Sequence, residues 1–294
     1  MTDVSAGEST RVASWRLLLR NPVTVVSAVV LAAIVLVALT AQWIAPFGFN
    51  DIDVPNALAP PSGTHWFGTD ELGRDVFSRV LVAIQASMRV AVVSVCFAVV
   101  VGVTIGVVAG YRGGWLDTVF MRVVDVMFAF PVLLLALAVV AILGPGATTT
   151  MLAIGIVYTP IFARVARASS LSVRVEPFVL ASQTMGTGPM YILRRHILPN
   201  ISGPLIVQTS LSLAFAILSE AALSFLGLGI QPPQPSLGRM IFDSQGFVTL
   251  AWWMAVFPGA AIFVAVLAFN LLGDGLRDVL DPKQRTMIEA RRQR

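Results

Sequence analysis

Residues Glu176 to Asn200 read Glu-Pro-Phe-Val-Leu-Ala-Ser-Gln-Thr-Met-Gly-Thr-Gly-Pro-Met-Tyr-Ile-Leu-Arg-Arg-His-Ile-Leu-Pro-Asn, a polar and basic stretch between two long apolar runs. The glycines and proline from Gly186 to Pro189 predict a bend that joins two short helices. A loop that leaves the apolar part of a chain and folds into helices of its own offers a surface to another protein. The fold on either side of this loop follows from the distribution of charge.

The chain is strongly apolar: 56% of its residues are hydrophobic, 12% are charged, and its mean hydropathy is +0.83. Soluble domains carry about 25% charged residues, so this composition predicts an all-α membrane protein. A charged side chain at the centre of a bilayer costs roughly 2.5–3.5 kcal/mol, and a spanning helix needs about 20 residues. The intervals without charge therefore predict six transmembrane helices, at about 23–45, 82–109, 118–142, 148–168, 202–226 and 250–273.

The basic residues indicate which ends of these helices face the cytoplasm. If the N-terminus is inside, sixteen of the 20 basic residues lie on the cytoplasmic side. Only Arg74, Arg79 and Arg239 lie outside, and Arg89 lies within the second span. Because cytoplasmic loops carry the excess of Lys and Arg, we expect the loop 169–200 and both termini in the cytoplasm.

Several kinds of chemistry are excluded by residue type. Lys283 is the only lysine and is followed by Gln284, so no phosphate-binding loop ending in Gly-Lys-Ser/Thr exists. The only histidines, His65 and His196, fall on opposite sides of the membrane, which argues against a His-based zinc site or a Ser-His catalytic pair. No basic patch interleaved with aromatic residues indicates nucleic-acid binding. We therefore expect no catalytic residue, metal or cofactor in this chain, and any energy-supplying reaction belongs to a partner.

Glycines and prolines mark special positions within the expected spans. The Gly102-x-x-x-Gly106-x-x-x-Gly110 repeat favours close packing against another helix, which the sequence does not identify. Pro131, Pro160 and Pro258 fall inside the third, fourth and sixth spans and should kink them. Kinked helices suit a gated pathway, but proline is also frequent in static bundles.

Several ionisable groups lie in or near the expected spans. Glu220 lies in the fifth span, where it either faces a water-filled transport pathway or bonds within the bundle. Arg122 and Asp125 lie three apart, so a local ion pair is expected. In the acidic loop 46–81, the second half should become helical, with Thr69 or Asp70 as its cap.

The loop at 176–200 resembles the cytoplasmic EAA loop of bacterial ABC importer permeases, with the pattern Glu-Ala-Ala, three residues, Gly, nine residues, Ile-x-Leu-Pro. Leu180 replaces the acidic residue of this pattern, and His196 replaces its isoleucine. The sequence from His196 to Asn200 is similar to a variant found in peptide-transport permeases. The resemblance assigns coupling to an ATPase to Leu180, Ala181, Ser182, Gly186, His196, Leu198 and Pro199.

Further motifs in matching order resemble the C-type subunit of dipeptide, oligopeptide and nickel ABC importers. They lie at Phe67–Arg79, Ser219–Gly229, Gln231–Pro233 and Leu267–Asp278, so the resemblance runs from about residue 64 to 283. It implies the type I importer permease fold, in the bacterial inner membrane, with both termini cytoplasmic. The expected division is an N-terminal segment 1–80 with the first transmembrane helix and an external loop, a five-helix core 81–283, and a basic tail 284–294.

The resemblance also implies a set of partners. These are a paralogous B-type permease, two cytoplasmic ATPase subunits that bind ATP and Mg, and an external solute-binding protein, all around a chain embedded in membrane lipid. Dipeptides or short oligopeptides are the favoured substrates, and nickel or a metal chelate is the main alternative. A membrane scaffold that moves nothing is a competing class. A secondary transporter is disfavoured because the halves of the chain show no convincing duplication.

Overall fold

The computed structural model describes residues 21–280, and the regular secondary structure of this part of the chain is all helical, as predicted. The long helices are α2 (Pro22–Ile44), α3 (Val76–Arg112), α4 (Gly114–Phe128), α5 (Val132–Leu143), α6 (Ala147–Val173), α10 (Ser202–Phe225) and α12 (Trp253–Leu280). The short elements are η1 (Val54–Asn56), α7 (Pro177–Thr184), α8 (Pro189–Ile192), η2 (Leu193–Ile197), α9 (Leu198–Asn200), α11 (Leu237–Asp243) and η3 (Ser244–Gly246). The predicted tail 284–294 lies outside the described residues.

Five of these helices are long and apolar enough to cross a membrane, and α4 with α5 supplies a sixth span only as a bent pair. The two halves of that pair meet at 93° instead of forming the continuous third helix predicted at 118–142. Pro131 causes the break, because its ring restricts the preceding residue and its own ψ of 132° is extended. By contrast, α6 and α12 continue through Pro160 and Pro258, so kinks at these two prolines stay predictions.

The glycine repeat of α3 packs against α6, which is the partner helix that the sequence could not identify. A Cβ added at Gly106 would overlap the Ala163 carbonyl and lie 2.8 Å from the Ala166 Cβ. A Cβ added at Gly102 or Gly110 would meet the same helix at similarly short range. Only glycine lets the two backbones approach this closely, so the repeat fixes the α3–α6 pair at the centre of the bundle.

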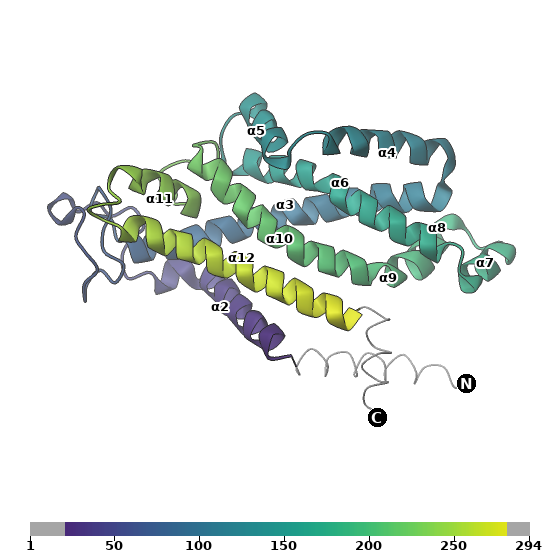
Figure 1. Cartoon of the computed structure of the whole chain (residues 1–294), viewed down its shortest axis with the longest axis horizontal. Helices are drawn as coiled ribbons and strands as arrows, with labels where there is room; N and C mark the ends of the chain where they lie inside the picture. The colour runs from purple at the N-terminus through teal and green to yellow at the C-terminus, as the bar shows by residue number, and fades with distance from the viewer. Residues whose placement is uncertain (1–20, 281–294) are drawn as a thin grey trace.

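The remaining helices surround this pair. Figure 1 shows α10 and α12 side by side, with α2 along α12 and with α4 and α5 on the opposite flank beside α6. The core between α3, α6 and α10 contains fully buried side chains such as Phe162, Ile154 and Ile217. Residues 45–75, called the 45–75 loop, lie with α11 at one end of the bundle, and α7 to α9 lie at the other end (Figure 1). The two regions singled out by sequence are thus at opposite ends.

Candidate functional site

The segment from α7 to α9, residues 177–200, has the bent two-helix form that was predicted. Pro177 and Pro189 occupy the first turns of α7 and α8, where their missing N–H groups cost nothing. Gly186 has φ of 76°, a value that glycine adopts without strain. The amide of Thr187 donates to the Ser182 carbonyl and the amide of Gly186 donates to the Gln183 carbonyl, which is the Schellman arrangement for ending a helix. The local sequence therefore determines both helices and the bend.

The outer face of the 177–200 segment is apolar and exposed. Leu180 is 46% exposed, and Ala181 beside it is exposed as well, whereas Val179 is fully buried against the rest of the chain. The exposed large apolar side chains of the segment are Phe178, Leu180, Met185, Met190 and Tyr191. Exposed apolar side chains gathered in this way mark a surface for another macromolecule.

The residues proposed for coupling divide into an outer and an inner group. Leu180, Ala181, Gly186 and Pro199 are exposed on the outer side. Ser182, His196 and Leu198 are only partly exposed: Leu198 packs against the hydrophobic core, and Ser182 Oγ lies 3.2 Å from His196 Nε2. The rings of Phe178 and Tyr191 each lie 5.9 Å from the His196 ring, a contact that no spacing in the sequence indicated.

Glu220 bonds within the bundle, which was one of the two readings of this residue. Its side chain is 0% exposed, and its two carboxyl oxygens accept hydrogen bonds from Ser87 Oγ at 2.6 Å and Ser224 Oγ at 2.7 Å. Close by, the hydroxyls of Tyr158 and Ser219 are 3.2 Å apart. These contacts join α3, α6 and α10, and Ser87 could not be found from sequence because it lies 133 positions away.

Two ion pairs join α4 to α6 and correct one prediction. Asp125 does not pair with Arg122; instead, Arg164 Nη2 lies 2.7 Å from Asp125 Oδ1, and the Arg164 guanidinium stacks over Phe128. Arg167 donates from Nε and Nη2 to the two carboxyl oxygens of Asp117. Between these pairs is an open cavity of about 450 Å³, lined by Met121, Asp125, Arg164, Arg167 and Ala168. A partner on the neighbouring helix thus replaces the one expected three residues away.

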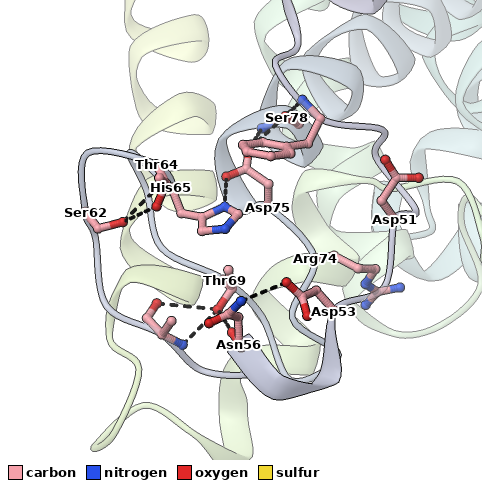
Figure 2. Close-up of polar contacts among 12 residues, drawn as sticks. Asp51, Asp53, Asn56, Ser62, Thr64, His65, Thr69, Arg74, Asp75 and Ser78 are labelled. Carbon is pink, nitrogen blue, oxygen red and sulfur yellow. Dashed lines mark hydrogen bonds and ion pairs between the residues drawn. The ribbon is translucent and has the colours of Figure 1, made fainter.

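At the opposite end of the bundle, Asp75 is the N-cap of α3. Its carboxylate accepts hydrogen bonds from the Ser78 amide at 2.8 Å and the Ser78 hydroxyl at 2.7 Å, and His65 Nδ1 lies 2.9 Å away (Figure 2). The predicted cap at Thr69 or Asp70 is therefore wrong by one turn or more. Thr69 instead donates its hydroxyl to the Asn56 carbonyl and so closes the loop on itself.

Asp70 organises the 45–75 loop from within. Its carboxylate accepts hydrogen bonds from the amides of Leu72 and Arg74 at 2.9 Å, from Arg74 Nε at 2.7 Å, and lies 3.4 Å from Arg79 Nε. Burial raises the pKa of the neighbouring Glu71 carboxyl, and the Asp70 carboxylate raises it further. Trp253 Nε1, at the start of α12, donates to the Thr69 carbonyl at 3.0 Å and ties the loop to the bundle.

Comparison with known proteins gives results that agree with these features. The family described as "Binding-protein-dependent transport system inner membrane component" matches residues 102–286, and "N-terminal TM domain of oligopeptide transport permease C" matches residues 10–61. A dipeptide transport system permease of Alkalihalophilus pseudofirmus is 42% identical over 94% of this chain and 92% of its own length. A probable D,D-dipeptide permease of Escherichia coli is 44% identical, covering 90% of this chain and 88% of its own.

A glutathione transport system permease of Escherichia coli is 45% identical over 92% of this chain and 89% of its own length. Among solved structures, two inward-facing forms of the MetNI methionine ABC transporter are similar in fold. One has a TM-score of 0.54 at 18% identity and covers 68% of this chain and 97% of its own. The other has a TM-score of 0.57 at 19% identity, with 69% and 96% covered. At this identity the likeness concerns the fold alone, and it reaches almost the whole of each solved chain.

Proposed function

Since this chain belongs to the family of binding-protein-dependent transport system inner membrane components, we propose that it is the permease subunit of an ABC importer for dipeptides or short oligopeptides. It is a multi-pass protein of the inner membrane, and ATP hydrolysis belongs to partner subunits. The relatives named for dipeptides and glutathione support a peptide substrate over nickel or a metal chelate. The same relatives are all permeases, which disfavours a scaffold.

The exposed apolar face of the 177–200 segment carries this proposal. A family of this kind works with ATPase subunits, a paired permease and a substrate-binding protein. We assign the face around Leu180 and Ala181 to a groove on one of two ATPase subunits, where small and apolar side chains let α7 lie flat. This assignment places the segment and both termini in the cytoplasm, and the 45–75 loop outside, next to the solute-binding protein. The B-type permease would complete the transport pathway.

The connections of α7 suit it to transmit motion. Only residues 174–176 separate α6 from α7, and the chain returns through α8 and α9 directly into α10. ATP can shift the equilibrium between inward and outward states only as far as its affinity for the two states differs. Movement of α7 by the ATPases would carry that difference to α6 and α10. The candidates for the gate that responds to this movement lie within the core 81–283. They are the break at Pro131, the helix positions Pro160 and Pro258, and Glu220, which lies on α10 and bonds to Ser87 of α3.

The test uses proteoliposomes that contain this chain with its copurified subunits and a binding protein loaded with dialanine. Ala181→Arg puts a charge on the proposed docking face, and Gly186→Val forces a β-branched residue into φ of 76°, which it rarely adopts. We expect both variants to insert normally and to lose dialanine uptake and stimulated ATP hydrolysis. Gly188→Val is the matched control, because Gly188 has φ of −63° and open space around its Cα. Normal stimulated hydrolysis in both test variants would rule out this placement of the coupling helix.

A further inference from the structure

The turn η2, just before α9, is a π-helix, a rare form that is frequent at functional sites. Its cause is Pro199, whose ring would collide with the Arg195 carbonyl in a regular α-helix. Widening the preceding turn relieves this collision, and the Leu198 amide donates to the Leu193 carbonyl five residues earlier. Ile192 and Ile197, also five apart, are 1% and 0% exposed. The π spacing therefore puts both isoleucines into the core.

The same turn holds His196 against α7. Asn200 Nδ2 donates to the His196 carbonyl at 2.6 Å, which holds the backbone at this position. The imidazole lies beside Phe178 of α7 and Tyr191 of α8, and its Nε2 reaches Ser182 Oγ at 3.2 Å. The histidine is thus held through its backbone carbonyl, its Nε2 and two neighbouring aromatic rings.

The direction of the Ser182–His196 hydrogen bond follows from the second contact of the serine. Ser182 Oγ lies 2.9 Å from the Phe178 carbonyl, to which it donates. A hydroxyl has one proton, so Ser182 has only lone pairs left for the imidazole. His196 Nε2 must therefore carry a proton and donate, which makes a chain from His196 through Ser182 to the backbone of α7.

We propose that His196 is a positioning residue that locks α7 to the helix leading into α10. The lock spans the bend at Gly186–Gly188, the point in the segment where the backbone has most freedom to pivot. When the Ser182–His196 hydrogen bond is formed, movement of α7 is transmitted directly to α10 as well as to α6. When the bond is broken, α7 pivots at the glycines and its movement no longer reaches α10 directly. This inference rests on the proposed coupling function and names the residue pair that makes coupling efficient.

The test measures dialanine uptake and phosphate release on the same proteoliposomes of the assembled importer. Ser182→Ala removes the acceptor, and His196→Phe removes the donor but keeps a ring beside Phe178 and Tyr191. We expect each to lower the dialanine moved per ATP hydrolysed about fivefold, the factor that one hydrogen bond of about 1 kcal/mol supplies. The ATPase subunits should still copurify. Because both changes remove one bond, the double variant should be no worse than either single variant.

Two further variants separate positioning from a merely structural role. His196→Gln keeps an amide donor near the position of Nε2 and should recover most of the coupling. Ser202→Ala is the matched control, because its hydroxyl donates only to the Pro199 carbonyl nearby. Normal coupling in both Ser182→Ala and His196→Phe, or losses that add in the double variant, would overturn the lock. If Ala181→Arg still abolishes stimulated hydrolysis in that case, the coupling function stands without the lock; if it does not, the coupling function itself fails.

Discussion

The two ends of this molecule treat charged side chains in opposite ways. In and beside the 45–75 loop, charged and polar side chains are buried: Asp70 is 4%, Arg74 8%, Asp75 3% and Arg79 4% exposed. In the 177–200 segment, Arg194 and Arg195 are exposed, while large apolar side chains are exposed at both ends, with Trp66 at 60% in the loop and Met185 at 83% in the segment. Charged side chains are rarely buried unless paired, and clustered apolar side chains are rarely left in water without a partner.

The difference separates an end whose charged side chains are paired within this chain from one whose charged side chains face outward. Each buried charge of the loop finds its partner in the same chain, so the loop is held in one shape before anything binds to it. The 177–200 segment keeps its own helices through caps and the Ser182–His196 contact but leaves its outer face without cover. Mutations at the first end should therefore act on stability, and mutations at the second end on transport.

The largest effect is expected for Asp70→Ala. It leaves the guanidinium groups of Arg74 and Arg79 buried without their shared carboxylate, and it removes the acceptor of two amides. Removing one partner of a buried pair costs about 3–5 kcal/mol, so we expect a strongly lowered melting temperature in detergent. Asp51→Ala, an exposed position in the same loop, should change the free energy of unfolding by less than about 0.5 kcal/mol. Equal losses in the two variants would show that the loop is not organised by Asp70.

A smaller loss of stability is expected for Trp253→Phe. The substitution keeps most of the buried ring but removes Nε1, so the Thr69 carbonyl loses its donor from α12. An orphaned buried acceptor costs about 1–3 kcal/mol. The neighbouring Trp252 is 50% exposed, and Trp252→Phe is the matched control with a change within about 0.5 kcal/mol. A melting temperature that falls equally in both variants contradicts a specific tie between the loop and α12.

Glu71→Gln should stabilise the loop in a pH-dependent way. The pKa of Glu71 is raised, mainly by burial, so the folded chain holds the proton more tightly than the unfolded chain does. The stability that protonated Glu71 gives the folded chain is fully present below the ordinary pKa of glutamate. It is lost as the pH rises through the raised pKa of the folded state. Arg74 opposes this shift, whereas Asp70 and Asp243 add to it.

At neutral pH we therefore expect Glu71→Gln to exceed the wild type in the free energy of unfolding by less than about 1 kcal/mol, with the gap closing on acidification. Melting curves of the two proteins across the acid range measure this gap. A gap that widens towards acid pH would mean that Glu71 is stabilised in its charged form.

Much of the bundle could be predicted because the cost of charge in a membrane is a local property of the sequence. The helices α2, α6 and α10 begin where the charge gaps placed them. In the third span, Pro131 predicted a kink at the right place, but the local pattern did not contain its size, a 93° break that leaves α4 and α5 as separate helices. Similarly, the second half of the loop 46–81 becomes helical as predicted, but α3 begins at Val76 and not after Thr69 or Asp70, because Asp75 is held as its cap by Ser78 and His65.

Within the candidate site, backbone features could be predicted and contacts between side chains could not. Gly186 and the proline at the start of α8 carry conformational preferences of their own, so the bend followed from residue type. The Ser182–His196 contact depends on a π turn, and Glu220 meets Ser87 only because α3 and α10 pack together. Aspartate 125 shows the same limit, since its nearest basic residue in sequence is not its partner.

The smallest effect on stability is expected for Leu180→Ser combined with Met185→Ser. Both side chains are exposed in the isolated chain, so replacing them should leave the free energy of unfolding within about 0.5 kcal/mol of the wild type. If an ATPase groove covers them, however, the importer loses apolar area that is buried only in the assembly, and burying one such side chain is worth about 1.5–3 kcal/mol. Uptake and copurification of the ATPase subunits should then fall at least tenfold while the melting temperature of the chain stays constant. Lost stability with intact uptake would reverse the assignment, because it would make this face part of the fold and leave the coupling surface elsewhere.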